Sequence, residues 1–386
     1  MKKRMIGLMM AFTMAASLLG GCAGAPVTTG DAGSSEAADN GGNEGLKIAI
    51  VSSPSGVDDG SFNQNNYEGI LAFIAEDPEA SVTPVKEESG DVAAAINMVA
   101  DIAADYDVIV CCGFQFAGIG TLAEENPDVD FILVDSAPTD ADGNETECAN
   151  IYSMTFKEQE GGFFAGLAAA LSTKTNKVAV VNGMAFPSNV NYEYGFMAGV
   201  NYANAKYGTA AEIVELPSYA GTDLFGNNVG GNYVGDFSDE ATGKVVGEAL
   251  IQEGCDVLFV AAGAAGNGVF TAAKEAKDVF VIGCDVDQYN DGAAGDRNIL
   301  LTSVLKVMHL NVTRQLEAIA AGTFTGEDAL LGADTDSTGF VSAEGRQQLS
   351  EDAIAKMTEC YEKLKAGEIV PPSGTEYKTD DFPGLK

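Results

Sequence analysis

Positive charge and histidine are scarce in this chain of 386 residues, and both shortages exclude classes of function. Lysine and arginine number 21 against 57 aspartates and glutamates, and the only histidine is His309. A surface so acidic repels phosphate backbones, so nucleic acid is excluded as a partner. With one histidine and no C-x-x-C pair, the chain lacks the usual ligands of a zinc site. The single histidine also argues against a histidine-dependent nucleophile. We therefore expect no metal site and no cofactor.

Signatures of common enzymes are missing as well. The chain has no G-x-S-x-G nucleophile turn and no G-x-x-x-x-G-K-[ST] phosphate loop. The glycines Gly263, Gly266 and Gly268 run in the reverse order of a dinucleotide fingerprint. The stretch over residues 285–292 resembles a calcium loop. In the register that puts Gly292 at position six, however, position twelve is Asn298, so the bidentate acid is absent. These absences favour a binding protein over an enzyme.

One long apolar run is present, and it lies at the amino terminus. A basic segment over residues 2–4 precedes an apolar stretch over residues 5–18, and two glycines stand directly before Cys22. This order predicts a secretory signal over residues 1–21. The cysteine resembles that of a bacterial lipobox, which implies cleavage before Cys22 and a lipid anchor on the outer face of the cell membrane. A plain signal peptide is the alternative. Residues 22–45, rich in small and polar residues, predict a flexible tether.

Strand and helix patterns alternate through the rest of the chain. Short β-branched runs and amphipathic stretches alternate about eight or nine times, from a strand over residues 48–51 to a helix over residues 306–321. This predicts an α/β fold with parallel sheets. Roughly 340 residues exceed one comfortable core, so two doubly wound lobes are expected. The six cysteines after Cys22 have no spacing that demands disulfides, and we expect structural thiols.

Polar residues collect where strands lead into helices. The first strand is followed by Asp58 and Asp59, and two later apolar strands end in Asp135 and Asp285. In an open parallel sheet such residues line the crevice at the carboxyl ends of the strands, where ligands bind. Carboxylates there accept hydrogen bonds from hydroxyls or amines, but each could instead cap a helix. The residues alone leave both interpretations open.

Four segments make the chain similar to the basic-membrane-protein family of lipoproteins, the purine-nucleoside receptors of ABC importers. They are VDDGSFNQNNYEGI, FILVDS, NYEYGFMAGVNYANAKYG, and DVLFVAAGAAGNGVFTAAKEA leading to FVIGCDVDQ. The similarity runs in order over nearly all of residues 46–323. It implies a type I periplasmic-binding-protein fold, with the ligand between two hinged lobes. The first lobe would comprise residues 46–153 and 284–320, and the second residues 154–283 and 321–386.

The resemblance implies a nucleoside held between two aromatic rings, one from each lobe. Phe62 in the SFNQ motif would be the first ring, and Tyr192 the second. The family often has phenylalanine at the second position, so Phe186 and Tyr194 are alternatives to Tyr192. The loop over residues 218–232 looks longer than is usual in the family, and it either shapes the entrance of the cleft or decorates the surface.

The resemblance also implies polar contacts to the sugar and the base. Asp285 and Lys306 would hold the ribose, and Asn63 and Asp135 would read the base. A carboxylate can accept both vicinal hydroxyls of ribose, which agrees with the role given to Asp285. The remaining ligand-binding candidates are Asp58, Gln64, Phe114 and Gly263.

The expected function is that of a monomeric, lipid-anchored receptor that captures a nucleoside for ABC permease and ATPase subunits. A nucleoside is uncharged, whereas a phosphate would meet several aspartates and only one cation, Lys306. One alternative is a nucleoside hydrolase that uses Asp58 and Asp59 as metal ligands or bases. Another is a receptor for a sugar or other small solute. The lipobox and the shortage of histidine favour a receptor over an enzyme.

Overall fold

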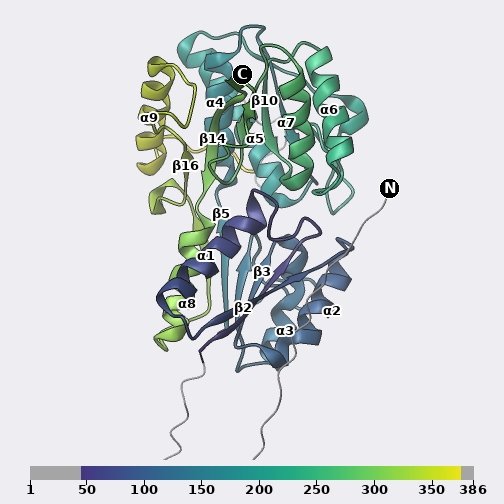
Figure 1. Ribbon diagram of the computed structural model, residues 1–386, viewed down its shortest axis with the longest axis vertical. Helices are drawn as coiled ribbons and strands as arrows, with labels where there is room; N and C mark the ends of the chain where they lie inside the picture. Colours follow the sequence, from purple (N-terminus) through teal and green to yellow (C-terminus); the bar gives the residue numbers. More distant parts are fainter. Residues whose placement is uncertain (1–44, 375–386) are drawn as a thin grey trace, which may run out of the picture. The chain divides into compact units, whose positions relative to one another are not determined.

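The structure, a computed structural model, describes residues 45–374 (Figure 1). The expected signal over residues 1–21 and the expected lipidation site Cys22 lie outside the described residues. The described residues belong to one compact unit. Within the described residues, no helix combines the length and the apolar character needed to cross a membrane. Every cysteine in this part of the chain is buried and unpaired, which confirms the expectation of structural thiols.

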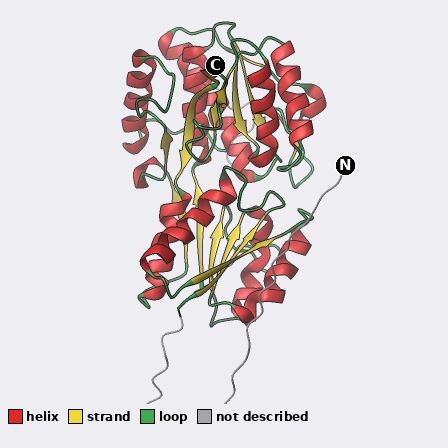
Figure 2. Ribbon diagram, viewed as in Figure 1, coloured by secondary structure: helices red, strands yellow, loops and turns green. Residues whose placement is uncertain are grey.

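A six-stranded sheet forms the centre of what we call the first lobe, and all its neighbouring strands are parallel. Its strands, in spatial order, are β15 (Glu327–Leu331), β5 (Ile151–Phe156), β4 (Asp130–Val134), β3 (Val108–Cys112), β1 (Lys47–Ser52) and β2 (Ser81–Lys86). Apolar side chains of α1 (Phe62–Glu76) and α8 (Met308–Ala320) cover one face, and those of α2 (Val92–Ile102) and α3 (Gly120–Glu125) cover the other. Helices thus enclose the sheet on both faces (Figure 2).

A second six-stranded sheet forms the centre of the second lobe. Its strands, in spatial order, are β16 (Thr338–Phe340), β14 (Leu300–Lys306), β11 (Phe280–Gly283), β10 (Val257–Ala261), β6 (Lys177–Asn182) and β7 (Glu212–Ile213). Only the β14–β16 pair is antiparallel within this sheet. The helices that cover it are α4 (Glu158–Ser172), α5 (Pro187–Tyr207) and α9 (Glu351–Lys365) on one face, and α6 (Glu240–Gln252) and α7 (Gly266–Glu275) on the other. The prediction of two doubly wound parallel sheets is therefore confirmed.

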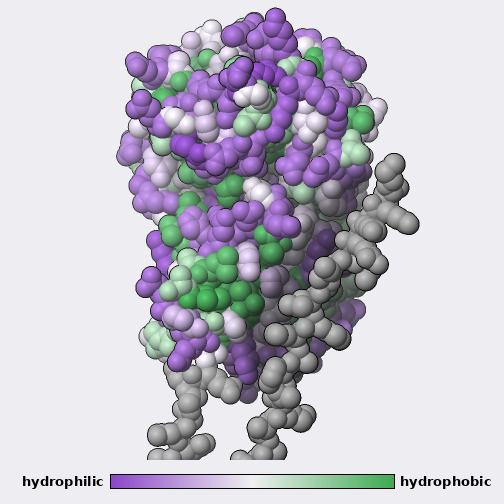
Figure 3. All heavy atoms as spheres, viewed as in Figure 1, coloured by the Kyte–Doolittle hydropathy of each residue, from purple (hydrophilic) through white to green (hydrophobic). Residues whose placement is uncertain are grey.

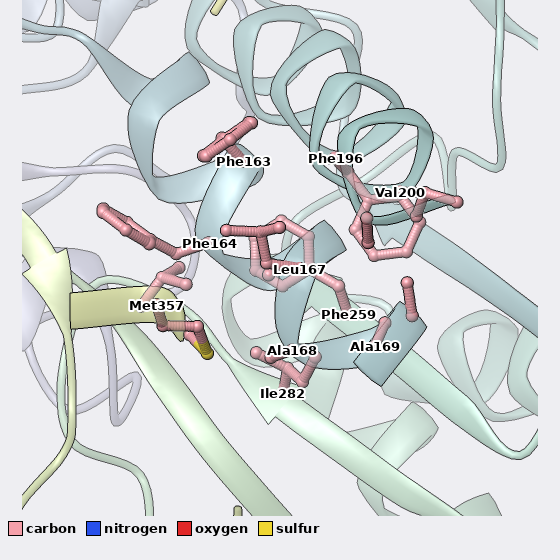
Figure 4. Packing of buried hydrophobic residues seen from close by; sticks show 14 of the residues in the cluster. Phe163, Phe164, Leu167, Ala168, Ala169, Phe196, Val200, Phe259, Ile282 and Met357 are labelled. Atoms are coloured by element: carbon pink, nitrogen blue, oxygen red, sulfur yellow. The ribbon is translucent and has the colours of Figure 1, made fainter. Parts of the chain in front are cut away.

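Glycines bring α4 and α5 into close contact, and this fixes the residues that α5 presents to the centre of the molecule. A Cβ atom on Gly162 would lie 2.2 Å from the carbonyl oxygen of Tyr192, and one on Gly195 would lie 2.2 Å from that of Gln159. No side chain fits at such distances, so only glycine permits this approach. Aromatic and aliphatic side chains of both helices, β10 and α9 fill the space around the contact (Figure 4).

The chain crosses between the lobes three times within residues 45–374: from β5 to α4, from β14 to α8, and from β15 to β16. Two strands therefore differ from the expected lobe boundaries. β14 falls in the range expected for the first lobe but pairs with β11 in the second, and β15 falls in the range expected for the second but pairs with β5 in the first. An apolar strand pattern shows that a segment is buried, but not in which of two sheets.

Candidate functional site

A cavity lies between the lobes, at the carboxyl ends of the strands of both sheets. It encloses about 630 Å³ of space free of atoms, part of it open to solvent. The lobes contact each other around it. Ser55 Oγ of the first lobe donates a hydrogen bond to the carbonyl oxygen of Phe237 in the second, at 3.1 Å. The rings of Phe114 and Phe186 also meet across the cleft, with centroids 5.7 Å apart.

Most of the ligand-binding residues expected from the sequence line this cavity. They are Phe62, Asn63, Phe114, Asp135, Tyr192, Gly263, Asp285 and Lys306. Asp58 and Gln64 do not line it. Asp58 is exposed to solvent, and the amide of Gln64 bonds to the backbone N–H of Gly60 and to Glu68. The expectation for these two residues is therefore corrected, and the neighbouring acid Asp59 takes the place of Asp58 in the cavity wall.

Asp59 organises the start of α1. Its carboxylate accepts the backbone N–H groups of Ser61, Asn63 and Gln64, each at 3.0 Å, and the side-chain amide of Asn63 at 2.8 Å. Burial raises the pKa of Asp59 in spite of these hydrogen bonds. Both carboxylate oxygens are thus engaged in holding the first helical turn. This occupation and the exposure of Asp58 leave the hydrolase alternative without the pair of free carboxylates that it requires.

Asn63 presents an unused acceptor at the cavity. Its side-chain nitrogen donates to Asp59 Oδ2 at 2.8 Å and to Ser53 Oγ at 3.0 Å. Because an ionised carboxylate only accepts hydrogen bonds, this contact fixes which way the amide points. The amide oxygen Oδ1 is buried and has no hydrogen-bond partner among the described residues. Buried acceptors are rarely left unpaired, so the arrangement favours a ligand that brings an N–H or O–H donor.

A buried lysine in the cavity wall lies among three carboxylates. Lys306, the last residue of β14, places its Nζ atom 2.5 Å from Asp135 Oδ1 and 3.1 Å from Glu158 Oε1, and its side chain is 2 % exposed. Burial raises the pKa of Asp135 to about 7, against the attraction of Lys306. Burial alone would lower the pKa of Lys306, but the attraction of Asp135, Glu158 and Asp285 holds it above its usual value. One cation among three acids gives a site that disfavours anions.

Aromatic rings surround the same ammonium group. The Nζ atom of Lys306 lies 5.2 Å from the ring centroid of Phe62, 5.1 Å from that of Phe156 and 6.0 Å from that of Tyr192. Cations at such distances are attracted to aromatic faces. The two rings proposed from the sequence for stacking, Phe62 and Tyr192, therefore both lie beside the charged cluster. Flat apolar surface and polar groups are available within one cavity.

The three candidates for the second stacking ring differ in position. Tyr192 lines the cavity, and its ring packs edge-on against Phe259 at 5.6 Å between centroids. Phe186 also lines it and lies between Phe114 and Phe237, with centroids 5.7 and 5.8 Å away. Tyr194 belongs instead to a small apolar cluster outside the cavity wall. Of the three candidates, Tyr192 and Phe186 therefore line the cavity and Tyr194 does not.

Several cavity residues were not expected from the sequence. They include Ser53, Ser55, Ser61, Gln115, Ser188, Asn189 and Phe237. Most of them come shortly after strands that the sequence predicts. Their position after a strand, rather than their residue type, could therefore have identified them. Phe237 had no such signal, because it lies in an irregular segment before α6. The loop over residues 218–232 forms the short hairpin of β8 (Gly221–Thr222) and β9 (Asn228–Gly230), and none of its described residues lines the cavity.

Two doubly wound lobes with a polar and aromatic cavity between them define the type I periplasmic-binding-protein fold. Solved structures agree on the fold. The chain is similar to an ABC transporter solute-binding protein from Aeropyrum pernix, with a TM-score of 0.71, 24 % identity and coverage of 85 % of this chain and 94 % of that one. A solute-binding protein from Conexibacter woesei gives a TM-score of 0.62 at 23 % identity, covering 85 % of this chain and 99 % of that one.

The chain belongs to the Bmp family, described as ABC transporter substrate-binding protein PnrA-like, whose model matches residues 46–216 and 227–374. The gap in the match falls in the loop that the sequence suggested was long. A CD4+ T-cell-stimulating antigen of Listeria innocua is 30 % identical, over 96 % of this chain and 99 % of that protein. The ABC transporter nucleoside-binding protein BmpA of Lactococcus lactis is 31 % identical, over 73 % of this chain and 77 % of that protein.

Membership of this family confirms the resemblance seen in the sequence. The protein is therefore a substrate-binding protein of an ABC transport system, a class that binds a solute and works with permease and ATPase subunits. Such proteins act outside the cytoplasm in association with the membrane. The family and its structural neighbours are binding proteins rather than enzymes.

Proposed function

We propose that this protein captures a neutral nucleoside, of the purine class, between its two lobes and delivers it to an ABC importer. The observation that carries the proposal is the cavity itself, where aromatic faces lie beside three carboxylates and a single ammonium group. The nucleoside-binding relative from Lactococcus lactis supports the same ligand class. Attachment to the membrane through a lipid on Cys22 is part of this proposal.

The base would lie between aromatic rings. Phe62 of the first lobe and Tyr192 or Phe186 of the second offer faces to a flat purine, and stacking of this kind is favourable for every base. Asn63 would accept a hydrogen bond from an N–H group of the base through its unpaired Oδ1 atom. Asp135 would accept another from its place beside Lys306. These two acceptors suit the amino and ring N–H groups of purines.

The ribose would lie beside Asp285 and Lys306. An ionised carboxylate accepts hydroxyl protons, and an ammonium group donates to hydroxyl or ring oxygens. Both residues line the cavity at the ends of neighbouring strands, β11 and β14. A 5′-phosphate would bring two negative charges toward a cluster that already holds three carboxylates against one cation. We therefore propose that nucleoside monophosphates are rejected by charge.

Mass spectrometry of the small molecules released from the purified protein tests the ligand class. The lobes contact each other around the cavity, so we expect a tightly held ligand to survive purification and to appear as a ribonucleoside after denaturation. A sample denatured after exhaustive dialysis against a competing nucleoside serves as the control, because it should release the competitor instead. Release of a free sugar or an amino acid, displaced by no nucleoside, would contradict the proposal and favour the receptor for another solute.

A further inference from the structure

The carboxylate of Asp285 is held in a fixed position at the cavity wall. Asp285 follows β11 with only Cys284 between them, and it has a φ of 68°, in the left-handed region that few residues other than glycine adopt. Its carbonyl oxygen accepts the backbone N–H of Lys306 at 2.9 Å, which ties the loop to the end of β14. The main chain that carries this side chain is therefore held in place at the cavity wall.

Two donors occupy one oxygen of this carboxylate. The Tyr192 hydroxyl donates to Asp285 Oδ1 at 2.7 Å, and the Cys284 thiol donates to the same atom at 3.4 Å. Burial, reinforced by the charge of Asp285, raises the pKa of the Tyr192 phenol and of the Cys284 thiol well above their usual values, so both stay protonated. A carboxylate oxygen has two lone-pair directions, and here both are taken. Oδ2 has no hydrogen-bond donor among residues 45–374.

We propose that Tyr192 and Cys284 turn Asp285 into an acceptor with one free oxygen, so that this carboxylate reads only one of the two ribose hydroxyls. Tyr192 is then a residue that determines sugar specificity through its hydroxyl, in addition to any stacking by its ring. The inference rests on the proposed function, because it concerns how the same cavity receives a nucleoside. It differs from the expectation of the sequence analysis, in which Asp285 was free to accept both hydroxyls.

Removal of the Tyr192 hydroxyl should change which hydroxyls of the ribose contribute to the binding affinity. In Tyr192→Phe the ring remains, but Oδ1 regains a free lone pair beside the cavity. A second ribose hydroxyl can then bond to the carboxylate. A hydrogen bond to a charged group contributes enough to change affinity about tenfold or more, so the effect is measurable. Cys284→Ala frees the other lone pair and should act in the same direction with a smaller effect, because a thiol is a weak donor.

The test is titration calorimetry with four ligands: a ribonucleoside and its 2′-deoxy, 3′-deoxy and 2′,3′-dideoxy forms. For the wild-type protein, we expect that loss of one hydroxyl weakens binding about tenfold or more, and that loss of the other weakens it less than about threefold. For Tyr192→Phe, we expect both losses to weaken binding by about fivefold or more. Tyr207→Phe is the matched control, since its hydroxyl lies 3.6 Å from Cys360 Sγ and away from the cavity.

The outcomes separate the inference from the proposed function. An unchanged pattern of the two deletions in Tyr192→Phe would overturn the inference, as would equal losses for both hydroxyls in the wild-type protein. A uniform loss of affinity for all four ligands in Tyr192→Phe would also overturn it, because the hydroxyl would then contact the ligand itself. Failure of every ligand to bind the wild-type protein would overturn the proposed function, and the inference with it.

Discussion

Replacement of Lys306 with methionine is expected to destabilise the protein by about 3–5 kcal/mol, because it leaves buried carboxylates without a counter-ion. Lys306 is the one cation in contact with Asp135 and Glu158 in the described part of the chain, and all three side chains are almost completely buried. Methionine has a similar length and no charge, so the change removes the ammonium group with little loss of volume. Urea unfolding at pH 8, followed by circular dichroism, measures the loss.

The destabilisation should depend on pH in a defined direction. An acid whose pKa is raised by folding contributes stability that is full below its unfolded pKa and is lost as pH rises through its folded pKa. The folded pKa of Asp135 is about 7 with Lys306 present, and loss of the ammonium group removes the attraction that opposes burial. At pH 5, Asp135 in Lys306→Met can be protonated, so no buried charge is left unpaired. At pH 8, folding must either bury the unpaired carboxylate or take up a proton from a solution that holds few, and both cost stability. We expect a smaller loss at pH 5.

Two further variants make this test specific. Lys244→Met removes an exposed lysine that contacts Glu275 at 2.8 Å and Glu248 at 3.7 Å, and it should cost no more than about 1 kcal/mol, with no comparable pH dependence. Lys306→Met combined with Asp135→Asn should recover part of the stability, because one buried charge is removed along with its partner. Wild-type stability in the single variant, or the same loss at pH 5 and pH 8, would contradict the proposed charge cluster.

Phe62→Ala is expected to weaken nucleoside binding about 5- to 150-fold, the effect of losing about 1–3 kcal/mol of stacking on one base. Phe62 lines the cavity at the start of α1 and lies 5.2 Å from the ammonium group of Lys306. Titration calorimetry measures the change once circular dichroism has shown that the variant is folded. Phe324→Ala is a suitable control, because Phe324 packs against the same apolar cluster but does not line the cavity. Wild-type affinity in folded Phe62→Ala would exclude Phe62 from the site.

The alternation of strands and helices made the fold predictable from the sequence. Buried parallel strands form continuous apolar runs in the sequence, and β3 begins and ends where such a run does. The lobe to which each strand belongs was not predictable in the same way. β14 and β15 lie on either side of α8 in the chain, and either could have paired in either sheet. The sheet that each strand joins depends on its pairing with strands far away in the sequence, and such pairing has no signature in the strand's own residues.

The cavity was partly predictable because polar residues that follow apolar strands meet at one edge of a parallel sheet. Asp135 and Asp285 were found in this way, and both adopt positive φ values that fit a tight turn. The choice between Asp58 and Asp59 depends on which side chain turns back over α1, and adjacent acids do not differ in sequence pattern. Figure 3 shows a face of the molecule that is hydrophilic over much of its area, with a hydrophobic patch on its lower part.

The hydrogen bond between Tyr192 and Asp285 shows a second limit of sequence analysis. The two residues are far apart in the chain, and the hydroxyl that joins them is a small change from the phenylalanine that the resemblance suggested. The sequence indicated that an aromatic ring was kept at this position. It could not indicate that the added hydroxyl reaches a carboxylate on another strand, because that contact depends on the packing of α5 against α4.

The most direct test of the account is titration calorimetry of the ligand-free protein with guanosine, adenosine and inosine, each compared with its 5′-monophosphate. We predict that at least one nucleoside binds at a single site, and that its monophosphate binds at least about tenfold more weakly because of the carboxylates around Lys306. Monophosphates that bind as tightly as the nucleosides, or the absence of binding by all three nucleosides, would contradict the central claim that this cavity selects a neutral nucleoside.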